Sequence, residues 1–217
     1  MKKNNQNYCH FYIIRHGETE WNIEGRLQGQ KDSSLTANGK RQAKELAKML
    51  RQVKFDECFS SDLTRAADTA QILALDHQLA VKTSALLREG RFGRFEGKTK
   101  ADLQQELQTA LDIREQLSRE ERFRYRTEET METDEEMMAR MITFLRQTAL
   151  AYSGKTVLVV SHGAMMRTLL IHLGWAEYGE LEGGAIENSG FIVLDSDGVD
   201  FFVKETDGVT KSMLSSK

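Results

Sequence analysis

The most constraining feature of this chain is a short run of β-branched and apolar residues, Thr156 to Val160, set between two helical segments. The run is continuous rather than alternating, which is typical of a strand buried on both faces of a parallel sheet. A second run, Tyr8 to Ile14, is also short, apolar and rich in β-formers. Both runs predict buried strands.

Several segments carry apolar residues at the spacing of one helical face. They are residues 43–50, a stretch beginning near Asp62, residues 133–148 and residues 164–173. Thr36 is an expected N-cap for the first of them, and Thr133 with Glu136 forms a capping box. The stretch from Ala101 to Arg126 is helical in pattern but highly charged, and its end from Arg119 has no clear boundary.

Further strands are predicted at Glu57 to Ser60 and in a hairpin over Gly190 to Val203, which turns at Asp197-Gly198. Strands that alternate with helices imply the α/β class, as a three-layer sandwich with a mostly parallel central sheet. At 217 residues, one domain covering 1–217 is expected, with a small helical cap insertion at roughly 94–133.

Composition excludes several classes of protein. Lys and Arg number 30 against 33 Asp and Glu, a net charge of −3 that argues against a nucleic-acid partner. Two cysteines are too few for a disulfide framework or a Cys-rich zinc site. No segment has the length of a membrane span or the pattern of a signal peptide, so no membrane partner and a cytoplasmic location are expected.

Two His-Gly pairs each come directly after a predicted central strand. Arg15-His16-Gly17 follows the first strand, and Ser161-His162-Gly163 follows the strand that ends at Val160. Ligands of open α/β sheets bind at the carboxyl edge of the strands. Either histidine alone is more often structural, but the matching contexts predict that His16 and His162 share one pocket.

Two arginines have the same placement. Arg15 precedes the first histidine, and Arg65 lies in the first turn of the helix after the second strand. Arginine stays charged and binds phosphate through two N–H groups at once. Two arginines and two histidines around one point suit a phosphoryl group, although Arg65 taken alone is as readily an exposed helix residue.

Four blocks of sequence now carry a family resemblance. They are residues 15–22 (RHGETEWN) with 26–29 (RLQG), residues 60–70 (SSDLTRAADTA), residues 87–97 (LREGRFGRFEG) and residues 160–163 (VSHG). In this order and spacing the chain resembles the histidine phosphatase superfamily, which includes the phosphoglycerate mutases. The resemblance runs from residue 11 to about residue 170.

The resemblance implies a role for each matching residue. His16 resembles the nucleophile that becomes a phosphohistidine, and Glu89 the proton donor. The remaining implied site residues bind the phosphate or the substrate. They are Arg15, Arg65, His162, Asn22, Gln28, Gly29 and Gly163.

The chemistry of these residue types agrees with the implied roles. His16 must keep one ring nitrogen unprotonated to attack phosphorus, and a backbone carbonyl such as that of Gly17 could hold the other nitrogen as N–H. The arginines and a protonated His162 are expected to spread over the developing charge. Because arginine replaces a cation, neither a metal ion nor another cofactor is expected.

The leading hypothesis is therefore a metal-independent phosphomonoesterase acting on a small phosphorylated metabolite. A 2,3-bisphosphoglycerate-dependent phosphoglycerate mutase and a weakly catalytic phospholigand-binding protein are the alternatives.

The chain lacks the proline-rich lid segment of the mutases, and its own residues 119–133 are expected to be charged and without apolar cover. Seven basic residues of the cap are candidates for a second acidic group on the substrate: Lys98, Lys100, Arg114, Arg119, Arg122, Arg124 and Arg126. The C-terminal hairpin offers an edge for a homodimer.

Overall fold

The computed structural model describes residues 8–212; residues 1–7 and 213–217, the ends of the expected 1–217 domain, lie outside the described residues. One sheet has the strand order β3-β2-β4-β1-β5-β6. The strands are β1 (Cys9–Arg15), β2 (Glu57–Ser60), β3 (Val81–Thr83), β4 (Thr156–Ser161), β5 (Ile186–Ser196) and β6 (Phe201–Val209). Strands β1 to β4 are parallel, whereas β5 and β6 form the antiparallel hairpin. The predicted α/β class with a mostly parallel sheet is confirmed.

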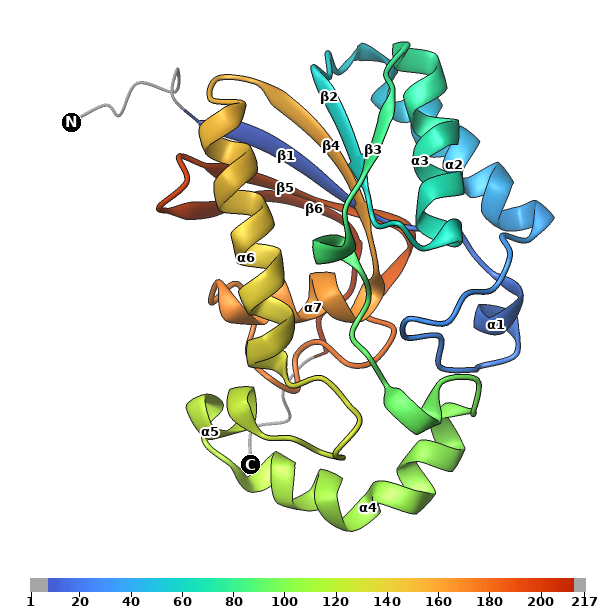
Figure 1. Ribbon diagram of the computed structural model, residues 1–217, viewed down its shortest axis with the longest axis vertical. Helices are drawn as coiled ribbons and strands as arrows, with labels where there is room; N and C mark the ends of the chain where they lie inside the picture. The colour runs from blue at the N-terminus through green and yellow to red at the C-terminus, as the bar shows by residue number, and fades with distance from the viewer. Residues whose placement is uncertain (1–7, 213–217) are drawn as a thin grey trace.

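Helices cover both faces of this sheet (Figure 1). They are α1 (Glu20–Ile23), α2 (Ala37–Met49), α3 (Thr64–His77), α4 (Lys100–Gln116), α5 (Arg119–Arg124), α6 (Asp134–Ala151) and α7 (Gly163–His172). Helices α2 and α3 lie on one face, and α6 and α7 on the other. Short 3₁₀ turns lie at Leu50–Gln52, Ala85–Leu87 and Gly93–Phe95.

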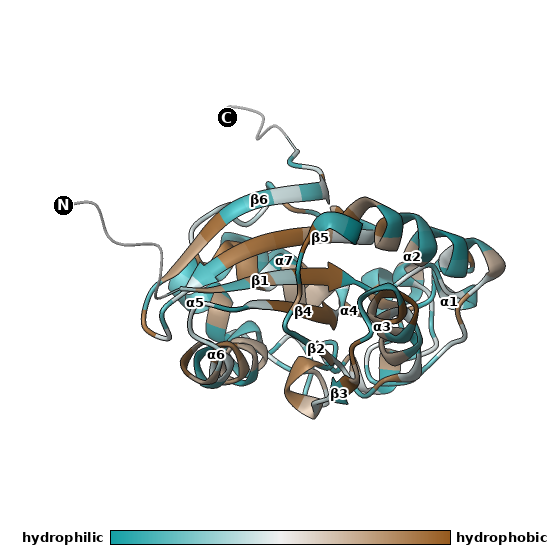
Figure 2. Cartoon of the chain, turned by 90° about the horizontal axis from the view of Figure 1, so that it is seen from above, coloured by the Kyte–Doolittle hydropathy of each residue, from teal (hydrophilic) through white to brown (hydrophobic). Residues whose placement is uncertain are grey.

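The alternation of side chains along each strand divides the core into two layers. In β1, Phe11 and Ile13 face α6 and α7, whereas Ile14 packs with the residues of α2 and α3. Strand β4 divides in the same way, with Val159 on the first side and Val160 on the second. The central strands β1 and β4 contribute buried apolar side chains to both layers, and Figure 2 shows hydrophobic residues along them. Close packing on both faces fixes the position of the strands and of their ends.

The capping predictions are confirmed. The Thr36 hydroxyl accepts the N–H of Gly39 at 2.9 Å at the start of α2, and Thr133 and Glu136 form the reciprocal capping box that opens α6. The helix predicted to start near Asp62 begins at Thr64, and its N-cap, Leu63, makes no side-chain cap. The hairpin is longer at both ends than the predicted 190–203.

Helices α4 and α5 lie beyond the carboxyl ends of the parallel strands (Figure 1). The region that was expected to lack a clear boundary from Arg119 folds as α5, which begins at a Ser118–Glu121 capping box. Helix α4 is bent at Leu107, whose backbone is not helical, and none of its side chains is buried. The two helices therefore stand over the edge of the sheet without joining its core.

Candidate active site

Strands β1 and β4 bring the two histidines together. Arg15 and Ser161 are paired in register at the ends of these neighbouring strands, so His16 and His162 leave the sheet side by side. Their ring centroids are 5.2 Å apart, and both side chains are buried. The predicted meeting of two residues 146 positions apart is thus present.

The imidazole of His16 is held in one tautomer. Its Nδ1 lies 2.7 Å from the carbonyl oxygen of Gly17, which can only accept a hydrogen bond, so Nδ1 carries the proton. Its Nε2 accepts a hydrogen bond from Nε of Arg65 at 3.3 Å. The expected contact with the Gly17 carbonyl is confirmed, and the unprotonated nitrogen faces a guanidinium group.

Burial and the nearby guanidinium groups of Arg65 and Arg15 lower the pKa of His16 well below its usual value. Burial, Arg65 and His16 likewise lower the pKa of His162. Both rings are therefore neutral near pH 7 in the protein alone. The expectation of a protonated His162 concerns the developing charge of the reaction and stays a prediction; without a ligand, burial and the guanidinium groups disfavour a further positive charge there. A phosphate dianion beside the ring would act in the opposite direction.

Arg65 is fully buried, and its guanidinium group is held on every side. It donates to the carbonyl oxygens of Gly29 at 2.7 Å and Lys31 at 2.8 Å, and to Oδ1 of Asp32 at 2.9 Å. Its Nε remains directed at His16. These bonds fix the group in one orientation, as a preorganised charge requires.

Asp32 is a site residue whose role the sequence did not indicate. Besides binding Arg65, its carboxylate accepts the backbone N–H groups of Thr64 and Arg65 and so caps helix α3. Burial raises the pKa of Asp32, but the Arg65 charge and the three hydrogen bonds outweigh it and lower the pKa below the usual value. The loop from β1 thereby anchors the helix that carries Arg65.

The guanidinium group of Arg15 packs against Gly163, the first residue of α7. One of its terminal nitrogens donates to the carbonyl of Ile186 at 2.6 Å, and its Nε is buried without a partner among the described residues. A Cβ atom at Gly163 would come within 3.0 Å of that Nε. Glycine at position 163 thus lets the backbone of α7 lie against the guanidinium group.

Glu89 enters the site from the segment after β3. Its carboxylate accepts three backbone N–H groups, from Gly90 at 2.9 Å, Ala164 at 3.0 Å and Met165 at 2.9 Å. The last two belong to the first turn of α7, where the positive end of the helix dipole favours a carboxylate. Glu89 is therefore fixed in place beside the two histidines, on the same pocket as His16.

Arg140 of α6 holds the segment that carries Glu89. It donates to the carbonyls of Leu86 at 3.0 Å, Arg88 at 2.6 Å and Glu89 at 2.9 Å, and its remaining nitrogens bind Glu132. Sequence reasoning missed this residue, because the three carbonyls that it binds lie more than 50 positions away. An arginine beside the apolar residues Met137, Met138 and Met141 of one helix is the signal that could have indicated it.

Asn188 is a second residue that the sequence did not indicate. Its amide nitrogen donates to the carbonyl of His16 at 3.0 Å and to the side-chain oxygen of Asn22 at 3.2 Å. That oxygen also accepts the N–H of Thr19 at 3.1 Å. Strand β5 thereby fixes both the backbone of the candidate nucleophile and the expected phosphate donor.

One pocket of about 320 Å³ collects most of the predicted site. Eight of the nine predicted residues line it: Arg15, His16, Asn22, Gln28, Gly29, Arg65, Glu89 and Gly163. His162 does not line it, since it is fully buried beside His16. Of the seven candidate basic residues in the expected cap, Lys100 and Arg114 line the pocket.

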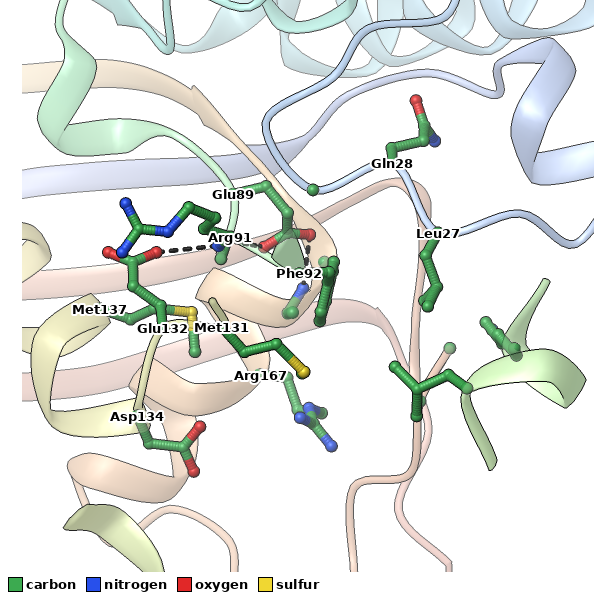
Figure 3. A pocket seen from close by; sticks show the side chains of 18 of the residues that line it. Leu27, Gln28, Glu89, Arg91, Phe92, Met131, Glu132, Asp134, Met137 and Arg167 are labelled. Carbon is green, nitrogen blue, oxygen red and sulfur yellow. Dashed lines mark hydrogen bonds between the residues drawn. The ribbon is translucent and has the colours of Figure 1, made fainter. Parts of the chain in front are cut away.

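One part of the pocket wall is apolar, which corrects one expectation, and charged side chains such as Lys100 and Arg114 line the pocket as well. Tyr125 and Met131, within the segment expected to lack apolar cover, both line the pocket together with Leu103 and Leu111 of α4. Figure 3 shows Met131 among the side chains around the cavity, with Leu27 and Phe92 nearby. The high charge of residues 119–133 concealed this inward face.

Within residues 8–212, no three His, Cys, Asp or Glu side chains gather in a way that could hold a metal ion. No helix in that range is long and apolar enough to cross a membrane.

Comparison with known proteins places these residues in context. The model of the histidine phosphatase superfamily (branch 1) matches residues 11–207. The uncharacterized phosphatase PhoE of Bacillus subtilis (strain 168) is 32% identical over 161 residues, which cover 74% of this chain and 75% of that relative. The probable phosphoglycerate mutase GpmB of Proteus mirabilis (strain HI4320) is 45% identical over 92 residues, 42% of this chain and 43% of that relative. The match therefore spans less than half of the mutase's length.

Solved structures that resemble this chain match it over most of its length. YhfR of Bacillus stearothermophilus has a TM-score of 0.78 at 28% identity, over 90% of this chain and 95% of that chain. Phosphoserine phosphatase of Entamoeba histolytica in complex with 3-phosphoglyceric acid has a TM-score of 0.74 at 27% identity, over 92% and 96%.

Proposed function

The chain belongs to branch 1 of the histidine phosphatase superfamily and is an enzyme of that superfamily, and we propose that it hydrolyses a small phosphate monoester without a metal ion, through a phosphohistidine at His16. The observation that carries the proposal is the tautomer of His16, whose Nδ1 proton is held by Gly17 while Nε2 faces Arg65. A nucleophile of this kind needs Nε2 unprotonated at neutral pH, so that its lone pair can turn from Arg65 to the phosphorus atom when the ester binds. The lowered pKa of His16 supplies that state.

In the first step, Nε2 of His16 attacks phosphorus, and the bond from phosphorus to the ester oxygen breaks. Arg15 and Arg65 stabilise the charge on the phosphoryl oxygens, where a metal ion acts in other phosphatases. Glu89 gives a proton to the departing oxygen, which requires that it be protonated once the negatively charged phosphate group of the ester lies beside it. The alcohol leaves and His16 carries the phosphoryl group.

In the second step, a water molecule attacks the phosphohistidine. Glu89, now a carboxylate, accepts the proton of that water, so that it returns to its starting form. The bond from phosphorus to Nε2 breaks, and inorganic phosphate is released. The position of Glu89 at the start of α7, on the same pocket as His16, supports this assignment.

Residues 94–133 are proposed to act as a cap that selects the substrate. The support is that α4 and the segment before α6 line the pocket through Leu103, Leu111, Tyr125 and Met131. The relatives differ in the activities for which they are named, a phosphatase and a probable phosphoglycerate mutase among them. That difference makes a mutase the second candidate. A phosphatase passes the phosphoryl group from His16 to water, whereas a mutase returns it to the bound product.

A rapid-quench experiment with a phosphorus-labelled ester tests the proposal. We expect a labelled protein that loses its label in acid and keeps it in base, as a phosphohistidine does. His16→Ala should lose the label and nearly all turnover, whereas His77→Asn, a half-buried histidine outside the pocket, should keep both. If His16→Ala retains about a tenth of the wild-type rate or more, His16 is not the nucleophile.

A further inference from the structure

The segment that leads into α4 is joined to the loop after α1 by a short antiparallel ladder. The N–H of Leu27 donates to the carbonyl of Lys98 at 2.9 Å, and the N–H of Gly97 donates to the carbonyl of Leu27 at 2.8 Å. Figure 1 shows the start of α4 beside this loop. The base of the cap therefore lies against the loop whose carbonyls hold Arg65.

One carboxylate oxygen connects the two segments. Oε1 of Glu96 accepts the backbone N–H of Gln30 at 3.0 Å and that of Phe92 at 3.0 Å. Gln30 belongs to the loop after α1, whereas Phe92 lines the pocket from the segment between Glu89 and α4. Glu96 thereby fixes the loop after α1 relative to the segment that carries Glu89.

The peptide unit between Gly29 and Gln30 is bound on both sides. Its N–H donates to Glu96, and its carbonyl oxygen accepts Nη2 of Arg65 at 2.7 Å. A trans peptide unit is planar, so its N–H and its C=O point in opposite directions. The hydrogen bond to Glu96 on one side therefore directs the carbonyl to Arg65 on the other.

Glycine at position 29 gives this restraint its importance. Its φ of +56° is one that glycine adopts readily, and glycine reaches other backbone conformations at little cost. The side chain of Glu96 occupies the place where a Cβ atom of residue 29 would lie. Without Glu96, the peptide unit is free to rotate, and its carbonyl turns away from Arg65.

We propose that Glu96 is a positioning residue for the reaction, which holds the peptide unit between Gly29 and Gln30 so that Arg65 stays in place beside His16. The inference rests on the proposed function, because it concerns the orientation of Arg65 during phosphoryl transfer. The restraint comes from the base of the cap. The cap therefore acts on the chemistry as well as on the choice of ester.

Glu96 also carries a charge that acts on Arg65, and two substitutions separate this charge from the hydrogen bonds. Burial lowers the pKa of Arg65, and the charges of Asp32, Glu89 and Glu96 oppose that shift. Glu96→Gln removes the charge but keeps a side-chain oxygen that can accept both N–H groups. Glu96→Ala removes the charge and the acceptor together.

The two variants are compared in the hydrolysis of p-nitrophenyl phosphate. Glu96→Ala should lower kcat by about tenfold or more and raise the inhibition constant of vanadate by a similar factor, since a charged hydrogen bond to Arg65 is lost. Glu96→Gln should stay within about threefold of the wild type in both, as the loss of a weak exposed charge allows. The control is Glu45→Ala, an exposed glutamate of α2 paired with Arg41, which should change neither quantity.

A double-mutant cycle tests whether the effect passes through Arg65. In an Arg65→Met background the carbonyl of Gly29 has lost its partner, so Glu96→Ala should lower kcat by no more than about twofold further. A loss as large as in the wild-type background would overturn the proposal, because Glu96 would then act by another route. Urea unfolding of each variant separates a loss of kcat from a loss of folded protein.

Wild-type kcat and vanadate inhibition in folded Glu96→Ala would also overturn the positioning role. An equal loss in Glu96→Gln would do the same, since it would assign the effect to the charge. Absence of phosphate-ester turnover in the wild-type protein would instead contradict the proposed function. The crystal structure of Glu96→Ala then decides the positioning role alone. The role stands if Arg65 has lost its bond to the Gly29 carbonyl, and it is overturned if that bond remains.

Discussion

Asp32 holds Arg65 from two directions, since its carboxylate binds the guanidinium group at 2.9 Å and also accepts the backbone N–H of the same residue at 3.4 Å. The acid therefore fixes both the side chain and the helix turn from which that side chain extends. With Arg65 held in this way, its Nε can stay on His16. Asp32 is thus a positioning residue rather than a catalytic one.

Asp32→Asn should lower kcat by about 10- to 100-fold, because one charged hydrogen bond that orients Arg65 is lost. The free energy of unfolding should fall by about 1 kcal/mol through the weakened cap of α3. Steady-state kinetics below the melting temperature and urea unfolding measure the two effects. Asp76→Asn, exposed near the end of the same helix, is the control. A variant that loses stability but keeps kcat would show that Asp32 serves only the fold.

Gly163→Ala should raise KM and weaken inhibition by vanadate, because the added methyl group would lie 3.0 Å from Nε of Arg15. Overpacking of this kind costs about 1–3 kcal/mol, and a loss of that size in binding energy corresponds to about 5- to 150-fold in affinity. Alanine also favours a helix over glycine by about 1 kcal/mol, so stability should change little. Gly183→Ala, whose methyl group would meet nothing within 4 Å, is the matched substitution. Equal inhibition constants in the two variants would contradict the close contact.

Acid should destabilise the fold from about pH 6.5 downward, near the ordinary histidine pKa. Folding lowers the pKa of His16 and His162, so below this pH the unfolded chain binds protons that the folded protein does not. The stability that these neutral rings contribute is complete above pH 6.5 and declines as the pH falls, by at most about 1.4 kcal/mol per histidine for each pH unit. Urea unfolding at several pH values measures the slope.

His162→Asn should flatten that slope, since it removes one of the two groups concerned. A slope that is identical in the wild type and in His162→Asn would show that the ring is protonated in the folded protein.

Activity should survive excess EDTA, because Arg15 and Arg65 supply the positive charge that faces the phosphoryl group. Vanadate or tungstate should inhibit competitively by occupying the same site. Both effects are measured by initial rates on one ester at fixed pH. Loss of activity in EDTA with recovery on adding one divalent ion would contradict the assignment of this role to arginine.

The phosphoryl group on His16 should pass to water more often than back to the bound product, so that hydrolysis dominates. The apolar residues that α4 places on the pocket wall, Leu103 and Leu111, are only half-buried, so we expect water to reach the phosphohistidine. Phosphorus NMR of a mixture of 3-phosphoglycerate and 2,3-bisphosphoglycerate measures the outcome. Release of inorganic phosphate, or no reaction, agrees with a phosphatase. Rapid interconversion of 3- and 2-phosphoglycerate would make the mutase the correct assignment.

The sequence predicted what local patterns encode. The strand before His16, the strand before His162 and the capping box at Thr133 all follow from short-range composition, and the structure contains each of them. Strand β3 and helix α1 were not predicted, because three or four residues carry too little periodicity. Short elements of this kind form because their neighbours are already in place.

The candidate site was predictable where a strand or helix end marked a residue, as for His16, or where the family resemblance supplied one, as for Glu89. Asp32, Arg140 and Asn188 bind partners that no spacing connects to them, and their roles became visible only in the folded chain. The inward face of the cap was concealed for another reason. Tyr125 and Met131 are isolated among charged residues, so average composition gave the wrong polarity for that wall.

The separation of α4 from the core has a consequence for how such a protein can diverge. The residues proposed to carry out the chemistry stand on strand ends packed on both faces, where most substitutions reduce stability. Leu103, Leu111 and Arg114 contact the pocket from a helix that contributes no buried side chain. These side chains are half-buried and lie outside the core, where substitutions usually cost less stability than they do within it. The choice of ester can therefore change through mutations in α4 while the fold and the phosphoryl chemistry are inherited intact.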